Sequence, residues 1–200
     1  MTAALRDGVR AAIAEFPRVA SPIEGRRPAA VAVAIVEDDE GAGVLVTRRA
    51  ARLRAHPGQW ALPGGRLDEG EDAVAAALRE MREELGVDAS ASSVLGLLDD
   101  YPTRSGYVIT PVVLWAGHVG PLTPNPDEVA SVHVAHLSEL DVDPLFVTIP
   151  ESDAPVIQLP VLGTHLHAPT AAILHQFREV ALHRRATRVA HYEQPVFAWR

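Results

Sequence analysis

The chain begins with hydrophobic residues at helical spacing, Leu5, Val9, Ile13 and Phe16, and Pro17 follows them. Residues three or four positions apart share one face of an α-helix, so this spacing predicts an amphipathic helix of about four turns. The segment SPIEGRRP after it has the composition of a linker. The pattern therefore predicts an N-terminal helix joined to the rest of the chain by an irregular segment.

Hydrophobic runs further along the chain predict β-strands. Two of these runs, 29–36 and 43–48, flank the acidic segment EDDEGAG, which is typical of a hairpin-like connection. The next segment, 50–65, carries several glycines and prolines, so much of it is expected to be loop. Further strands are expected at 93–98, 107–116, 130–136 and 155–161.

Two more helices are predicted. Residues 73–85 have a strongly helix-forming composition and stop before Gly86, which suits the left-handed conformation that follows many helix ends. Pro169 opens a closing helix with Ile173 and Phe177 on one side. The elements show no internal repeat and no change of composition that would mark a second domain. We therefore predict a single α/β sandwich with a mixed β-sheet.

Composition supports one well-filled domain and excludes some functions. The chain has 200 residues, of which 48% are hydrophobic and 22% are charged. A formal net charge of -8 argues against a general nucleic-acid or membrane-surface binder, which would need a basic excess. It leaves room for a phosphorylated small molecule, whose charge a metal ion and a few arginines can neutralise. With no cysteine, the chain has no disulfide, no thiolate nucleophile and no cysteine-based zinc site.

No targeting or membrane segment is evident. The first residues, MTAALRDGVRAAIAEFPRV, carry scattered charges without the hydrophobic core of a signal peptide. The run AAVAVAIV is too short to cross a bilayer and is better interpreted as a buried strand. We therefore expect a cytoplasmic protein that does not bind membranes.

Three glutamates stand out in the predicted helix at 73–85. Because Glu80, Glu83 and Glu84 are separated by three and four residues, one helix face carries all three. Clustered carboxylates repel one another unless they stay solvated, pair with arginine or bind a cation, and oxygen ligands favour Mg²⁺ or Mn²⁺. Two interpretations are thus open from these residues alone, a solvated helix face or a metal site for phosphate chemistry.

The residues around the glutamates decide between the two. The segment from Gly65 to Val87 resembles the box of the Nudix hydrolases, G-x5-E-x7-R-E-U-x-E-E-x-G-U, in which U is a large aliphatic residue. All of its specified positions are filled in this chain, by Gly65, Glu71, Arg79, Glu80, Met81, Glu83, Glu84, Gly86 and Val87.

The resemblance implies a Nudix-type α/β/α sandwich and hydrolysis of a nucleoside diphosphate linked to another group. It implies that Glu80, Glu83 and Glu84 bind Mg²⁺ or Mn²⁺, with Glu80 and Glu83 as candidate bases. Arg79 would orient a neighbouring glutamate, and Glu71 would brace the loop. Residues 1–200 are then expected to form a single Nudix hydrolase domain, with an N-terminal helix and linker at 1–26, the box at 64–87 and a C-terminal helix and tail at 168–200.

The segment before the box suggests a substrate. LVTRRAARLRAHPGQWALPGG resembles the motif of coenzyme A pyrophosphatases, approximately L-L-T-x-R-S-x3-R-x3-G-x3-F-P-G-G, and YPTRSGYVITPVV and PNPDEVASV also resemble that subfamily. Val46, Ala50 and Leu62 depart from the motif. Leu62 replaces a phenylalanine, which could alter either the shape of the pocket or only the packing of the core.

This second resemblance implies cleavage of coenzyme A or a derivative to 3′,5′-ADP and 4′-phosphopantetheine. Arginine can bind phosphate through two parallel hydrogen bonds, although each candidate could instead pair with a nearby carboxylate. Glu128, in a proline-rich loop, is a further candidate for the catalytic base or an extra ligand, or it is a plain loop carboxylate. The candidate substrate-binding residues are Arg49, Arg54, Gly58, Gly64, Gly65 and Arg104.

Two other functions remain open. One is an ADP-ribose or other nucleotide-sugar pyrophosphatase, and the other is a Nudix-fold binding module without catalysis. The expected partner is in each case a small nucleotide. The tail residues Val196, Phe197 and Trp199 are hydrophobic for a chain end, so the tail is expected to pack on its own domain or on a second subunit of a homodimer.

Overall fold

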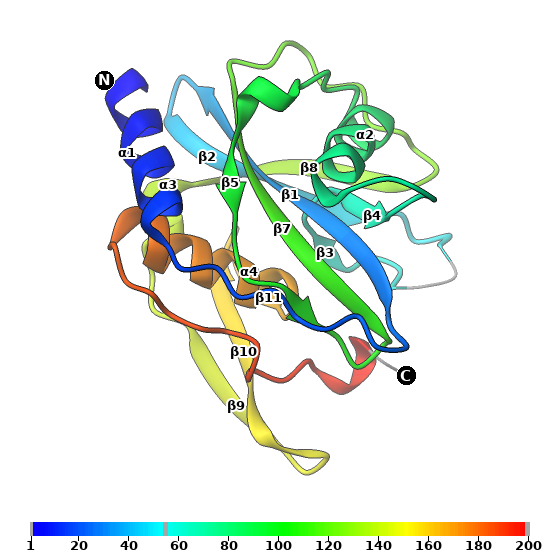
Figure 1. Ribbon diagram of the computed structural model, residues 1–200. Helices are drawn as coiled ribbons and strands as arrows, with labels where there is room; N and C mark the ends of the chain where they lie inside the picture. The colour runs from blue at the N-terminus through cyan, green and yellow to red at the C-terminus, as the bar shows by residue number, and fades with distance from the viewer. Residues whose placement is uncertain (1, 54–55, 199–200) are drawn as a thin grey trace.

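The computed structural model describes residues 2–53 and 56–198 and contains two sheets with helices around them (Figure 1). The predicted helix at 73–85 has those bounds, and each strand predicted from the hydrophobic runs is present. The helices are α1 (Thr2–Glu15), α2 (Ala73–Leu85), α3 (Leu137–Leu140) and α4 (Thr170–Phe177), with short helical turns η1 (Ala91–Ser93), η2 (Arg178–Leu182) and η3 (Val196–Ala198). The strands are β1 (Arg27–Asp38), β2 (Gly41–Arg49), β3 (Trp60–Ala61), β4 (Gly64–Arg66), β5 (Val94–Leu97), β6 (Tyr101–Pro102), β7 (Tyr107–Gly117), β8 (Val129–His136), β9 (Leu145–Ile149), β10 (Ser152–Val161) and β11 (Thr164–His167).

The main sheet is mixed, as the sequence predicts. Within the described ranges eight strands belong to it, and the central path runs β3-β2-β1-β7-β5. Strand β1 pairs in parallel with β7 and antiparallel with β2 and β4. Helix α2 covers one face of this sheet, while α1 and α4 lie on the other (Figure 1). The predicted α/β/α sandwich is therefore confirmed.

The two faces of β1 show why the layers stack in this way. Side chains alternate along a strand, so even and odd positions face opposite sides. On the α2 side β1 presents Ala30, Ala32 and Ala34, small residues that let the helix approach the sheet closely. On the other side it presents Val33 and Ile35, which join the larger core beneath α1, α4 and β10. One strand thus contributes to both hydrophobic cores.

A second sheet was not predicted from the sequence. It has the strand order β11-β10-β9, and its strands pair antiparallel. The hydrophobic run at 155–161 lies within β10, which begins earlier, at Ser152. Ile157 and Leu159 of β10 are fully buried in the core that also contains α4. This sheet and α4 together complete the layer opposite α2.

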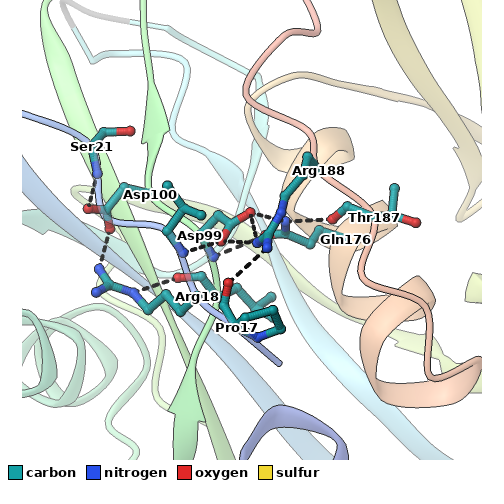
Figure 2. Close-up of polar contacts among 10 residues, drawn as sticks. Pro17, Arg18, Ser21, Asp99, Asp100, Gln176, Thr187 and Arg188 are labelled. Atoms are coloured by element: carbon teal, nitrogen blue, oxygen red, sulfur yellow. Dashed lines mark hydrogen bonds and ion pairs between the residues drawn. The ribbon is translucent and has the colours of Figure 1, made fainter. Parts of the chain in front are cut away.

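A buried polar cluster ties the two chain ends to the main sheet (Figure 2). Asp99, in the turn between β5 and β6, accepts hydrogen bonds from the Val19 backbone, the Gln176 amide and the Arg188 guanidinium, at 2.7, 2.8 and 2.8 Å. Its neighbour Asp100 is satisfied in the same manner by groups from the N-terminal linker and β7. These partners are Arg18, the Ser21 backbone and Thr110.

No helix in the part of the chain that the structure describes is both long enough and hydrophobic enough to cross a membrane.

Candidate active site

Helix α2 presents the box glutamates because both of its ends are well defined. At the start, the Asp72 side chain accepts a hydrogen bond from the Ala75 backbone at 2.8 Å, as an N-cap does. At the end, Gly86 takes the left-handed conformation, with φ 70°, that stops the helix. Met81 and Leu85 are fully buried against the sheet, which turns Glu80 and Glu84 toward the loop before α2.

Three carboxylates meet beside this helix. Glu80, Glu84 and Glu128 each offer an oxygen, and these oxygens lie within 4.8 Å of one another. Glu128 comes from the loop before β8, which is tethered to α2 because the Asn125 backbone donates to the Glu84 carbonyl at 2.8 Å. The Glu128 carbonyl in turn accepts from the Ala50 backbone at 2.8 Å. Two loops and one helix therefore assemble this carboxylate group.

Glu84 is the most buried member of the group. Glu84 is only 4% exposed, and its Oε2 atom has no hydrogen-bond partner among the described residues. Burial raises the pKa of Glu84 to about 8, and the negative charge of Glu80 adds to the effect, while Arg49 opposes it. Burial also raises the pKa of Glu80. A buried carboxylate oxygen without a partner is costly, so a cation bound to Glu84 Oε2 would relieve the penalty.

Arg79 holds three of the box carboxylates in place, those of Glu71, Glu80 and Glu83. Its guanidinium donates to both Glu71 oxygens at 3.0 Å and to Glu80 Oε1 at 2.8 Å. It also donates to Glu83 Oε2 at 3.0 Å and to the Arg66 carbonyl at 2.9 Å. The pKa of Glu71 is lowered chiefly by these bonds from Arg79. Arg79 thus joins the loop at Glu71 to the face of α2 that carries Glu80.

Glu83 stands apart from the three clustered carboxylates. It accepts one bond from Arg79, and half of its side chain, 50%, is exposed. The sequence places Glu83 among the metal ligands, whereas the structure groups Glu128 with Glu80 and Glu84. The physical reason is the angular spacing of the helix. Positions 80 and 84 lie only about 40° apart and both line the cleft, whereas position 83 lies about 100° from 84 and turns toward solvent.

The glycines of strand β4 allow the close approach of this helix. Gly65 pairs with Ala30 of β1 and lies directly against the Glu80 carboxylate. A Cβ atom at Gly65 would overlap that carboxylate, so a larger residue would displace Glu80. Gly64 and Gly65 both line the cleft beside the carboxylates. Their position therefore follows from packing as well as from turn geometry.

The carboxylates open into a cleft of about 630 Å³, a size that suits a small organic ligand. Arg49, the last residue of β2, lines it, and its buried Nε atom has no hydrogen-bond partner within the described residues. Gly58 does not line the cleft. It shapes the loop beyond β2 instead, with φ 68° and a hydrogen bond from its backbone to the Arg49 carbonyl at 3.1 Å.

The structure gives the remaining sequence candidates other positions. Arg54 lies outside the described residues, so its predicted phosphate contact is not addressed. Arg104 is committed to the buried Glu193, to which its Nε donates at 2.8 Å, and does not line the cleft. The geometry does not support the predicted phosphate contact of Arg104. Leu62 is buried, at 4% exposure, and belongs to the core as well as to the cleft wall.

Sequence reasoning missed part of the cleft wall. That part comes from segments that are distant in the chain, among them the start of α4 and the tail residues Gln194 and Ala198. Thr103 and Ser105 lie in the segment that resembles the coenzyme A subfamily, which was the available signal for them. Tyr107 lies in the same segment, whereas no specified motif position marked Arg66 or Gln194.

Comparison with known proteins gives the family. Residues 26–159 match the model of the NUDIX domain, which is more than half of the chain. The chain belongs to the Nudix family. The uncharacterized Nudix hydrolase NudL of Citrobacter koseri is 40% identical over 130 residues, which is 62% of this chain and 64% of NudL. The match thus spans less than two thirds of the length of that relative.

Solved Nudix structures share the fold. A MutT/Nudix family protein from Enterococcus faecalis aligns with a TM-score of 0.55 and 22% identity, over 85% of this chain and 64% of that one. The Nudix hydrolase RenU from M. smegmatis aligns with a TM-score of 0.54 and 23% identity, over 80% of this chain and 88% of RenU. At these identities the likeness supports the Nudix fold and nothing finer.

Proposed function

We propose that the protein is a metal-dependent hydrolase that cleaves the diphosphate of coenzyme A or a derivative to 3′,5′-ADP and 4′-phosphopantetheine. The observation that carries the hydrolase assignment is the group formed by Glu80, Glu84 and Glu128, whose oxygens lie within 4.8 Å of one another at the end of a cleft. Membership of the Nudix family supports the same reaction class. The choice of coenzyme A rests on the motif that precedes the box.

The carboxylates fit a divalent cation. Glu84 Oε2 is buried and lacks a hydrogen-bond partner among the described residues, and the other two carboxylates face it. Oxygen-only ligand sets suit hard cations, so Mg²⁺ or Mn²⁺ is the expected ion. We assign Glu80, Glu84 and Glu128 as its ligands, and Glu83 as a residue that acts through Arg79. A bound ion would screen the diphosphate charge and lower the pKa of a bound water molecule.

The chain's own residues supply positioning and proton transfer. Hydrolysis forms a bond from a water oxygen to one phosphorus while the bridging P–O bond breaks, and the water proton must pass to a base. Glu80 and Glu128 both line the cleft. They are the candidate bases, because a water molecule bound beside the diphosphate would lie within reach of their carboxylates. Arg79 holds Glu80 in place through the 2.8 Å bond.

Arg49 is the best-placed described residue for binding the diphosphate. It lies beside Glu84 in the cleft, and its buried Nε atom is uncommitted within the described ranges. A guanidinium can offer two parallel hydrogen bonds to a phosphate, which would both neutralise charge and orient the scissile bond. Arg49 therefore complements the carboxylates, since it offers the substrate a cation where they offer the metal an anion.

The test is a substrate comparison. The purified protein is assayed with coenzyme A, ADP-ribose and NADH in the presence of Mg²⁺ or Mn²⁺, and products are separated by chromatography. We expect the highest kcat/KM for coenzyme A and no turnover after the metal is chelated. Turnover of ADP-ribose alone would overturn the coenzyme A assignment and keep the hydrolase. Binding of a nucleotide without turnover of any substrate would favour a binding module.

A further inference from the structure

Two arginines contact one tyrosine of the cleft wall. The Arg27 guanidinium lies 4.2 Å from the centre of the Tyr107 ring, and that of Arg66 lies 5.7 Å from it. Arg66 Nε also donates to the Tyr107 hydroxyl at 3.1 Å. We call these three residues the arginine–tyrosine row. Arg66 and Tyr107 line the cleft, and Arg27 lies over the Tyr107 ring beside it.

Sheet register explains why these residues meet. Arg27 is paired with Tyr107 across the parallel β1–β7 ladder, and Arg66 is paired with Ala29 across the antiparallel β1–β4 ladder. Paired residues point to the same face of a sheet, and positions 27 and 29 of one strand also share a face. The row therefore lies on the rigid sheet, on the same face as the Ala29 and Ile109 that line the cleft.

The charges of the row are not neutralised by the protein. Among the residues that the structure describes, Arg27 and Arg66 form no ion pair, in contrast to Arg79 and Arg104, which are bound to glutamates. The Tyr107 ring contacts both guanidiniums and its hydroxyl accepts from Arg66, and neither contact supplies a negative charge. Both guanidiniums contact the same ring, so their like charges repel each other, and an anion bound by both would reduce that repulsion.

We propose that the arginine–tyrosine row is a second anion site, which binds a phosphate monoester carried by the nucleoside half of the substrate. It is distinct from the diphosphate position, which lies at the carboxylates and Arg49. Gly65, which abuts Glu80, and Arg66, the next residue of β4, both line the same cleft, so the two sites belong to it together. This inference rests on the proposed function, because it assumes that the diphosphate occupies the carboxylate end.

The row explains how the protein would select among nucleotides. Coenzyme A carries a phosphate on the ribose of its adenosine, whereas ADP-ribose and NADH do not. An arginine pair that accepts this phosphate would favour coenzyme A over both compounds and over 3′-dephospho-coenzyme A. Each charge-assisted hydrogen bond at such a partly exposed site is worth about a five- to tenfold change in binding. The row is thus a specificity determinant outside the metal centre.

The direct test measures equilibrium binding of adenosine 3′,5′-bisphosphate and of AMP by calorimetry with Mg²⁺ present. We expect the wild-type protein to bind the bisphosphate about five to ten times more tightly than AMP. Arg66→Gln and Arg27→Gln should each reduce that preference while AMP binding changes little. Tyr107→Phe, which keeps the ring and removes the hydroxyl, should reduce it less than Arg66→Gln, because Arg66 loses only one of its two contacts with Tyr107.

Arg82→Gln is the matched control. Arg82 is exposed on α2 and does not line the cleft. It is two residues from both Glu80 and Glu84, which places it on roughly the opposite side of the helix. Arg82→Gln removes the same charge from the protein as Arg66→Gln, so its preference for the bisphosphate over AMP should equal that of the wild type. Equal binding of both nucleotides by the wild type, or equal weakening of both by Arg66→Gln, would overturn the second anion site.

The outcome separates this inference from the proposed function. If the wild type hydrolyses coenzyme A and its 3′-dephospho form with the same kcat/KM, the second anion site is wrong and the proposed function stands. If the binding preference is present and depends on Arg66, but coenzyme A is not hydrolysed, the proposed function is wrong and the anion site stands. Thermal unfolding of each variant shows whether it is folded before its binding is compared.

Discussion

Two of the regions in which the protein buries carboxylates treat them in opposite ways. Asp99, between β5 and β6, is 4% exposed, and so is Glu84 in the candidate active site. Asp99 accepts hydrogen bonds from three groups, including the guanidinium of Arg188 (Figure 2). Glu84 has one oxygen without a partner in the described part of the chain. The two carboxylates are therefore equally buried, but the oxygens of Asp99 are fully hydrogen-bonded whereas one oxygen of Glu84 is not.

The difference distinguishes structural from functional carboxylates. A buried charge that is fully hydrogen-bonded stabilises the arrangement around it, here the junction of the N-terminal linker, β5 and the C-terminal segment. A buried carboxylate that has one unpaired oxygen and faces two other carboxylates destabilises the protein on its own and becomes favourable when a cation binds. Burial alone would not have separated Asp99 from Glu84, whereas the list of partners does.

The largest expected effect follows from removing the unpaired charge. Glu84→Gln should lower kcat by about a hundredfold or more, because it removes a charged ligand from the proposed metal site, while the fold stays intact. The matched variant is Glu83→Gln, which makes the same change one residue away on a half-exposed side chain bound to Arg79. Steady-state kinetics should show a smaller loss for Glu83→Gln. Similar losses in both variants would contradict the grouping of Glu84 with Glu128.

The next effect concerns stability in the other region. Asp99→Asn places an amide NH₂ where an oxygen accepts bonds, and it leaves Arg188 without its ion pair, so the free energy of unfolding should fall by about 3 kcal/mol. Asp7→Asn is the control, because the exposed Arg6–Asp7 pair should contribute less than about 0.5 kcal/mol. Urea denaturation measures both. At temperatures well below unfolding, kcat of Asp99→Asn should match the wild type.

The smallest expected effect is a pH dependence of the metal-free protein. The pKa of Glu84 is about 8 when folded, above its ordinary value of 4.5, so the folded state binds the extra proton between these pH values. The free energy of unfolding should therefore fall by about 1–2 kcal/mol as pH rises from about 6 to about 8. Mg²⁺ or Mn²⁺ should raise the melting temperature more at the higher pH, because fewer protons compete with it.

Glu84→Gln provides the check on that last expectation. It removes the titrating group, so the metal-free variant should lose this part of the pH dependence and gain little from added metal. Scanning calorimetry of both proteins with and without chelator measures these differences. A metal-induced increase that is equal at both pH values would show that Glu84 is not the group whose proton the ion displaces.

Much of the fold followed from local pattern. The helix at 73–85 matched to the residue because its composition, the cap at Asp72 and the stop at Gly86 all act within a few positions. The strands at 29–36 and 43–48 were longer than predicted but present, since continuous hydrophobic runs mark buried strands. The sheet formed by β9, β10 and β11 was missed, because its pairing and its packing on α4 depend on segments that periodicity does not connect.

The candidate site divides along the same line. The box predicted three residues of the site, Arg79, Glu80 and Glu84, because it fixes their spacing on one helix. Arg104 was expected at phosphate, yet it pairs with Glu193, a tail residue 89 positions away in the chain. A long-range partner of this kind carries no local signal, so pairing with a carboxylate was one of two open alternatives.

The sequence by itself determined the family and the helix that carries the box glutamates. These properties depend on spacing within short segments, and spacing is what a sequence records directly. Only the tertiary structure decided that Glu128 joins Glu80 and Glu84 while Glu83 does not, and that Arg27 and Arg66 meet at Tyr107. Those groupings depend on strand register and on loops held by distant backbone bonds, so they arise only when the whole chain has folded.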